Sequence, residues 1–204
     1  MRVANNDRWA GMGFCALLLS MVTTASGQGT FSWTLNGGGL YTNSANWTLT
    51  GGSGPAPPGI GDSAIFNILL DEYSVGFTGT TFSDYVQVSK GNVTFKSSGG
   101  LVQTFVITSG SADLLVSGGA SLYIGNDVDV LNVIIADDLI VAGNSSMHIQ
   151  TSSLVQAGDL ILGGLGTGAL YVKKSVLKIV GADSQDIGGI ISSVYLFLDK
   201  DASG

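Results

Sequence analysis

The sequence has little charge, little proline and almost no cysteine. Charged residues make up 11% of the chain, and the three prolines all lie between Pro55 and Pro58. Apolar residues make up 45%, which is too much apolar and too little charged character for an intrinsically disordered chain. The glycines follow no strict triplet period, so collagen is excluded as well. A folded protein of short apolar β segments and many tight turns fits this composition.

Residues 1–27 are predicted to be a signal peptide. Arg2 and Arg8 give a weakly basic start, an apolar run extends from Phe14 to Val22, and small residues follow at positions 25–27. The apolar run is shorter than the roughly 20 residues of a membrane-spanning helix, so a membrane anchor is the less favoured alternative. We therefore expect a protein that is secreted or held at the cell surface, with no membrane span in its mature part.

Removal of this segment would take away both arginines and Cys15, the only cysteine. The remaining chain has six lysines against fourteen acidic residues, a formal net charge of −8. A disulfide, a thiol nucleophile and a thiolate metal site are then excluded. Nucleic acid is excluded as a partner, because its recognition needs clustered lysine and arginine. No cofactor is expected.

The mature chain divides into two parts. Residues 28–61 contain Trp33, Trp47, three consecutive glycines and all the prolines, and are predicted to form an N-terminal cap and a proline loop. Residues 62–204 contain neither tryptophan nor proline and are predicted to form a β-solenoid. Solenoids need a polar cap on their last coil. Because the apolar stretch Val194–Leu198 is followed by none, we expect a chain that is truncated at its C-terminus or continued by further solenoid coils.

A repeat supports the solenoid. One set of four apolar residues with alternating spacing recurs position for position in the next set, and related sets precede and follow these two: Val86, Val88, Val93, Phe95; Leu114, Val116, Leu122, Ile124; Leu139, Val141, Met147, Ile149; and Leu170, Val172, Leu177, Ile179. Residues spaced by two share one face of a strand, which must be the core face. A hairpin meander requires no fixed period, whereas coils stacked on one another produce a period of roughly 20 to 30 residues. The sets that begin at Leu114 and Leu139 lie 25 residues apart.

Several segments resemble the opening and the repeats of autotransporter-like or planctomycete-type secreted bacterial proteins. They are the Gly- and Asn-rich stretch from Trp33 to Trp47, the pair Gly54-Pro55, the segment Gly61 to Phe66, and the repeat Leu114 to Gly125. The resemblance implies an all-β fold, a right-handed single-stranded parallel β-helix with a Trp/Gly-rich N-terminal cap, displayed outside the cell. It carries over no catalytic residue.

Two groups of polar residues are candidates for metal binding or catalysis. Asn126-Asp127-Val128-Asp129 follows a predicted strand, where a polar turn is favoured and calcium binding by Asp127 and Asp129 stays open. Asp137-Asp138 resembles the carboxylate pair of glycoside hydrolases. The β-helical enzymes of that kind also use a further aspartate, a His-Gly element and an Arg-x-Lys element. The mature chain has no arginine, so catalysis is not expected.

Neither the histidine nor the aromatic residues near the N-terminus are assigned to a functional site. His148, the only histidine, is equivalent to Tyr123 and roughly to Lys178 in the repeat, and is expected to face solvent. Trp33, Tyr41 and Trp47 could form a sugar-binding platform, but closing the hydrophobic end of the first coil is the favoured role.

No catalytic, metal or cofactor residue is therefore assigned. The sequence predicts a non-catalytic extracellular or cell-surface β-helix that acts as a scaffold, spacer or adhesin. The alternative is a carbohydrate-binding module or a polysaccharide-active β-helix, and surface polysaccharide is the partner to test.

Overall fold

The computed structural model describes residues 28–69, 71–108, 113–150, 152–163, 166–181, 186–187, 190–193 and 197–198. The predicted signal peptide at residues 1–27 lies outside the described residues. Most of the expected uncapped end does too, namely residues 194–196 and 199–204.

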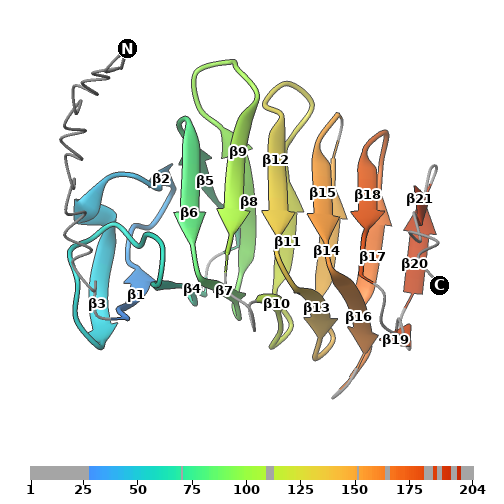
Figure 1. Cartoon of the computed structure of the whole chain (residues 1–204), viewed down its shortest axis with the longest axis horizontal. Helices are drawn as coiled ribbons and strands as arrows, with labels where there is room; N and C mark the ends of the chain where they lie inside the picture. Colours follow the sequence, from blue (N-terminus) through green and yellow to red (C-terminus); the bar gives the residue numbers. More distant parts are fainter. Residues whose placement is uncertain are drawn as a thin grey trace, which may run out of the picture.

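Strands in this part of the chain form three sheets that run side by side along one axis (Figure 1). Sheet A contains β1 (Thr30–Trp33), β3 (Trp47–Gly51), β4 (Ser63–Phe66), β7 (Tyr85–Val88), β10 (Asp113–Val116), β13 (Asp138–Ala142), β16 (Asp159–Gly163) and β19 (Asp186–Ile187). Sheet B contains β2 (Gly39–Leu40), β5 (Tyr73–Phe77), β8 (Asn92–Ser97), β11 (Ser121–Ile124), β14 (Ser146–Ile149), β17 (Ala169–Val172) and β20 (Ile190–Ser193). Sheet C contains β6 (Thr80–Ser83), β9 (Gln103–Ile107), β12 (Leu131–Ile135), β15 (Leu154–Ala157), β18 (Val176–Ile179) and β21 (Phe197–Leu198).

The order of the sheets along the chain shows how it coils. From β4 onward the strands visit sheets A, B and C in turn, and these triplets follow one another up to β21. Each strand pairs in parallel with its counterparts in the neighbouring triplets. The only helix among the described residues is one 3-10 turn, η1 (Ser44–Asn46). The predicted all-β solenoid is thereby confirmed.

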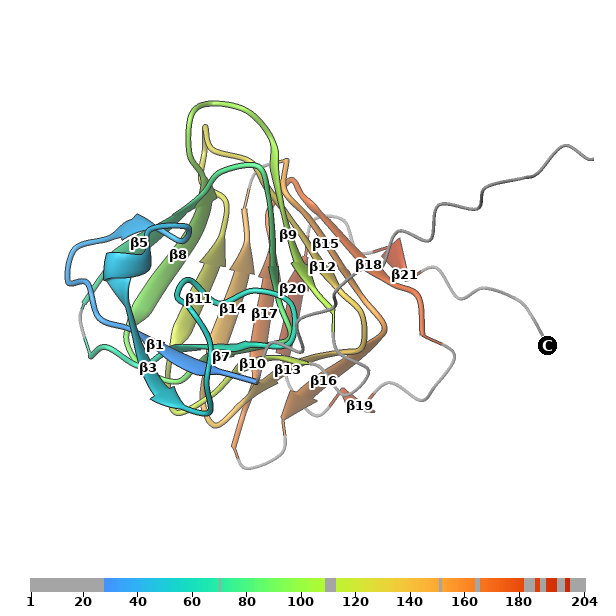
Figure 2. The same ribbon diagram turned by 60° about the vertical axis from the view of Figure 1, so that its left-hand side comes forward.

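The three sheets enclose one interior (Figure 2). The inward-facing side chains fill it. They form one continuous core in which most members are completely buried. Its N-terminal part is aromatic, with Phe66, Phe77, Phe95 and Phe105 in contact, and its C-terminal part is aliphatic. The alternating pattern found in the sequence therefore does mark the core face of each strand.

Backbone pairing confirms the repeat. Leu114 pairs with Leu139 between β10 and β13, and Leu122 pairs with Met147 between β11 and β14. The earlier coil is confirmed as well, because β7 and β8 pair with β10 and β11 in the predicted register.

The last set of the predicted repeat, Leu170, Val172, Leu177 and Ile179, was assigned wrongly by one side of the coil. Leu139 pairs with Leu160, whereas Leu170 pairs with Met147, and Leu177 pairs with Val155 on sheet C. The cause is that any two consecutive sides of a three-sided coil show the same pattern of alternating apolar residues around a short turn. The pattern alone does not say which corner the turn occupies.

The N-terminal end of the solenoid is closed by aromatic side chains. β3 pairs antiparallel with β1 at the edge of sheet A, which places Trp33 opposite Trp47. Their ring centroids lie 5.1 Å apart in an edge-to-face arrangement, and Tyr41 packs edge-on against Trp47 at 5.0 Å. Both indole nitrogens donate to backbone carbonyls, at 2.9 Å to Leu35 and 2.7 Å to Tyr41. These contacts cover the N-terminal end of the core.

Candidate binding face on sheet B

One row of aligned side chains runs along the middle of the outward-facing side of sheet B. Because alternate residues of a strand point to opposite faces, the positions between the core residues point outward. Parallel pairing then aligns them from strand to strand in the order Ser74, Thr94, Tyr123, His148 and Tyr171. We call these five residues the outer row of sheet B.

Three members of the outer row form a stack of rings, the aromatic ladder. The centroids of Tyr123 and His148 lie 4.5 Å apart with planes inclined by 15°, and those of His148 and Tyr171 lie 4.5 Å apart at 12°. Parallel strands about 4.8 Å apart bring in-register rings to stacking distance without further adjustment. The solenoid geometry therefore creates the ladder once three successive coils carry a ring at this position.

His148 is held in the middle of the ladder. Its Nε2 lies 3.2 Å from the Ser146 hydroxyl, and partial burial lowers the pKa of the imidazole from its ordinary value of 6.5. Burial acts in this direction because it penalises the charged form. The expected outward orientation is confirmed, but the expected equivalence with Lys178 was wrong. Lys178 pairs with Gln156 on sheet C.

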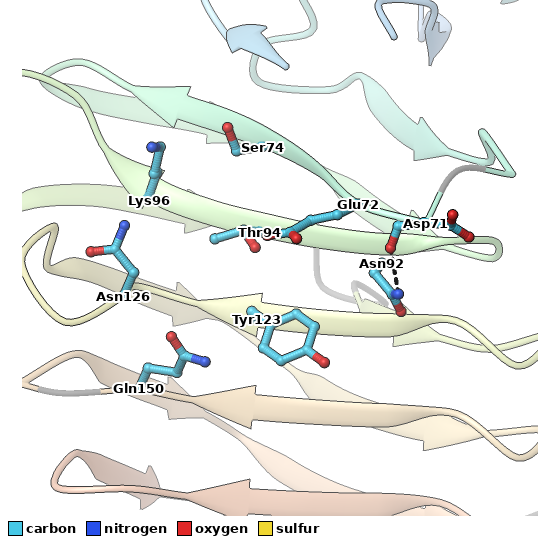
Figure 3. A pocket seen from close by; sticks show the side chains of 9 residues that line it. All are labelled: Asp71, Glu72, Ser74, Asn92, Thr94, Lys96, Tyr123, Asn126 and Gln150. Atoms are coloured by element: carbon cyan, nitrogen blue, oxygen red, sulfur yellow. Dashed lines mark hydrogen bonds between the residues drawn. The ribbon is translucent and has the colours of Figure 1, made fainter. Parts of the chain in front are cut away.

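A cavity of about 440 Å³ lies beside the ladder, over β5, β8 and β11 (Figure 3). It lies over the part of the outer row where the side chains are small, at Ser74 and Thr94. Tyr123, the next residue of the row after Thr94, borders it. The cavity is lined by Asp71, Glu72, Ser74, Asn92, Thr94, Lys96, Tyr123, Asn126 and Gln150.

Polar groups flank the cavity from both corners of sheet B. Figure 3 shows Asp71 and Asn92 on one side and Lys96, Asn126 and Gln150 on the other. The Asn92 amide donates to the backbone carbonyl of Asp71, which ties the first group together. The Lys96 ammonium lies 3.8 Å from the carboxylate of Asp129. The lining thus presents two exposed carboxylates, three amides and one lysine already near an acid.

The loop that carries Asp127 and Asp129 has the geometry of a polar turn. Asn126 Oδ1 accepts from the backbone nitrogens of Val128 at 2.9 Å and Asp129 at 2.7 Å. The Asp129 carboxylate also accepts from the Asn126 amide at 3.0 Å, in addition to facing Lys96. Both contacts use the same carboxylate oxygen, Oδ2, and calcium binding by Asp127 and Asp129 stays a prediction.

Asp137 and Asp138 lie outside this face, at the corner between sheets C and A. The structure brings them together with Asp159, with ligand oxygens of all three within 4.8 Å. Sequence reasoning missed Asp159 because the repeat was not continued as a shorter coil, although Asp159 precedes Leu160 as Asp138 precedes Leu139. Partly exposed acidic groups of this kind are common without a metal, so the cluster receives no assignment.

The aromatic residues available to a ligand are not the ones that the sequence singled out. Trp33, Tyr41 and Trp47 are buried, with 1%, 0% and 6% of their surfaces exposed, and they offer no platform. Tyr171, which is 37% exposed, and Tyr123 were missed as a pair. The signal was present in the correct register, which aligns both tyrosines with His148.

No helix in the described ranges is long and apolar enough to cross a membrane. Comparison of the chain with protein-family models, with curated proteins and with solved structures finds no match. The function is therefore argued from the fold and from the outer face of sheet B.

Proposed function

We propose that this protein is a non-catalytic extracellular or cell-surface β-solenoid that acts as a scaffold and adhesin, and that it binds polysaccharide on the outer face of sheet B. The observation that carries the proposal is the combination of the aromatic ladder with the adjoining polar cavity of about 440 Å³. Sugars are recognised by this combination, because their C–H faces pack on aromatic rings and their hydroxyls pair with amides and carboxylates.

The scaffold role is supported by how the solenoid is built. Each coil contacts mainly its neighbours, so a long and regular surface is produced from short segments. Extracellular display is proposed from the predicted signal peptide, from the low charge content and from the resemblance to autotransporter-like surface proteins. A regular rod with a repeated outer face suits the attachment of a cell or matrix to a long glycan.

The non-catalytic assignment rests on the groups available near the cavity. Downstream of the predicted signal peptide the sequence has no arginine or cysteine, and its only histidine lies inside the ladder rather than in the cavity lining. Acid–base chemistry on sugars needs two groups that flank the scissile bond. The two carboxylates of the lining, Asp71 and Glu72, are instead neighbours in sequence.

The test is binding of the purified protein to an array of neutral and acidic polysaccharides, with calcium and with chelator. We expect saturable binding to at least one polysaccharide, with no change in its chain length. Absence of binding to every polysaccharide would overturn the adhesin proposal and leave only a spacer role.

One observation favours a second candidate, polysaccharide cleavage. Asp71, Glu72 and Lys96 line the same cavity, which brings two carboxylates and an amine together. The same array experiment separates the two functions, because cleavage releases new chain ends that chromatography detects and binding does not.

A further inference from the structure

We propose that the cavity on sheet B is a subsite for a sugar ring of a neutral glycan, which stacks its C–H face on the open face of Tyr123. This inference rests on the proposed function, since it names the ligand class and the contact made on the same face. The sugar would continue the aromatic ladder beyond its last ring, in the space above Thr94 and Ser74.

The argument starts from the faces of the three rings. His148 lies between two tyrosines at 4.5 Å on each side, so both of its faces are covered. Tyr123 has His148 on one face, and its neighbour on the other side in the outer row is Thr94. Since Tyr123 is the only ring of the ladder among the cavity residues, its open face is the aromatic surface that a ligand in the cavity meets.

The space fits a saccharide. Two successive positions of the outer row carry small side chains, Thr94 and Ser74, along the cavity. Two strand spacings correspond to about 10 Å along the axis. The volume of about 440 Å³ falls within the range of roughly 300–1,000 Å³ that small-molecule sites occupy.

The polar groups fit hydroxyls in particular. Asn92 stands on one flank and Asn126 and Gln150 on the other, so primary amides face the cavity from both sides (Figure 3). An amide offers two donors and an acceptor, and a sugar hydroxyl is both a donor and an acceptor. A ring lying on Tyr123 would therefore present its equatorial hydroxyls to both flanks at once.

The charges select against acidic sugars. Asp71 and Glu72 contribute two carboxylates to the lining, and the single ammonium of the lining, on Lys96, already lies 3.8 Å from Asp129. A uronate carboxylate would meet repulsion from two like charges, while the one cation beside it is shared with another acid. The ligand class is therefore a neutral glycan, not a polyuronate.

The test compares binding of cellopentaose, mannopentaose and trigalacturonate to the full protein and to three variants by calorimetry. Tyr123→Ala removes the stacking face, and Thr94→Tyr fills the cavity by adding a ring to the ladder. Tyr85→Ala is the matched control, because it removes the same side chain from an outward position of β7 on sheet A, away from the cavity. Circular dichroism melting checks that each variant is folded.

We expect a neutral oligosaccharide to bind, with affinity reduced about tenfold or more in Tyr123→Ala and Thr94→Tyr and unchanged in Tyr85→Ala. Preferred binding of trigalacturonate would overturn the ligand class. If a neutral glycan binds but both cavity variants keep full affinity, the subsite is wrong while the adhesin proposal stands. If none of the three oligosaccharides binds and no polysaccharide on the array binds, the proposed function fails and the subsite with it.

Discussion

Among single residues, His148 is the position where packing and protonation are coupled. The imidazole lies between two phenol rings and is partly withdrawn from water, which favours its neutral form. In the unfolded chain the same side chain is hydrated and titrates at its ordinary value. Folding and proton uptake at this residue therefore oppose each other.

We expect the free energy of unfolding to depend on pH through His148. The folded-state pKa lies below the ordinary value of 6.5, so on acidification the unfolded chain takes up the proton first. Stability from this group is fully present above about pH 7.5, falls as the pH drops through 6.5, and stops falling below the folded-state pKa.

Urea unfolding at pH 7.5 and pH 5.5 measures this dependence, with His148→Gln as the comparison. The variant should lose less stability than the wild type between the two pH values. If the free energy of unfolding falls by the same amount in both proteins, the coupling is contradicted, because aspartate and glutamate groups contribute equally to both.

Among the strands, the assignment of a segment to one side of the coil was the main difficulty. β17 (Ala169–Val172) and β18 (Val176–Ile179) show the same apolar alternation as β13 and β14, but they lie one sheet further on. Coil length explains the slip, because the step from Asp138 to its partner Asp159 is shorter than the step from Asp113 to its partner Asp138. The residues missing from the shorter coil are missing from its turns, because turn length varies more freely than strand length.

Paired cysteines distinguish the two registers. Ile140 pairs with Ile161 on sheet A, and both occupy outward positions between buried aliphatic residues, so Ile140→Cys with Ile161→Cys should form an intrachain disulfide. Neighbouring strands lie about 4.8 Å apart, within the Cα separation of about 4.4–6.8 Å that a disulfide spans.

The matched control is Ile140→Cys with Tyr171→Cys, the pair that the uncorrected repeat would have placed side by side. Because these positions lie on different sheets, the control should stay reduced under the same mild oxidation. Mass spectrometry in a Cys15→Ser background measures both. A disulfide in the control and none in the first pair would refute the register.

In the molecule as a whole, the three sheets share one core, and its aromatic part connects all of them. Phe95 on sheet B contacts Phe66 of sheet A at 4.9 Å and Phe105 of sheet C at 6.2 Å between ring centroids. The aromatic cluster joins residues 28–61 to the coils that follow, through Tyr41 and Trp47. Stability at this end therefore depends on large side chains that no single strand could bury.

Replacement of Phe95 by alanine should lower the free energy of unfolding by about 3–5 kcal/mol, since a completely buried ring is lost and its cavity cannot collapse between three hydrogen-bonded sheets. Leu69→Ala is the control. Leu69 is 80% exposed, and its replacement should change stability by no more than about 0.5 kcal/mol. Denaturant unfolding measures both, and equal effects would show that the aromatic cluster is not the core of this end.

The candidate site was predicted less well than the fold. Tyr123 and His148 were recognised as equivalent, because both lie in the part of the repeat that backbone pairing confirms. Tyr171 was missed because a shorter coil separates it from His148, so the step that connects Tyr123 to His148 overshoots it. The acidic and amide residues at the cavity come from several coils and share no motif, so no spacing in the sequence connects them.

The all-β class, the inward-facing positions and the solenoid follow from the sequence alone, because side-chain alternation and a coil-length repeat are local and need no knowledge of neighbours. The charge balance that disfavours nucleic acid follows from it too. Which segments share a sheet emerged only from the three-dimensional fold, since corner turns of variable length shift the register. That fold also aligned Tyr123, His148 and Tyr171 and formed the cavity beside them. Each coil contributes a single residue to the outer row, so the row forms only when successive coils stack in register.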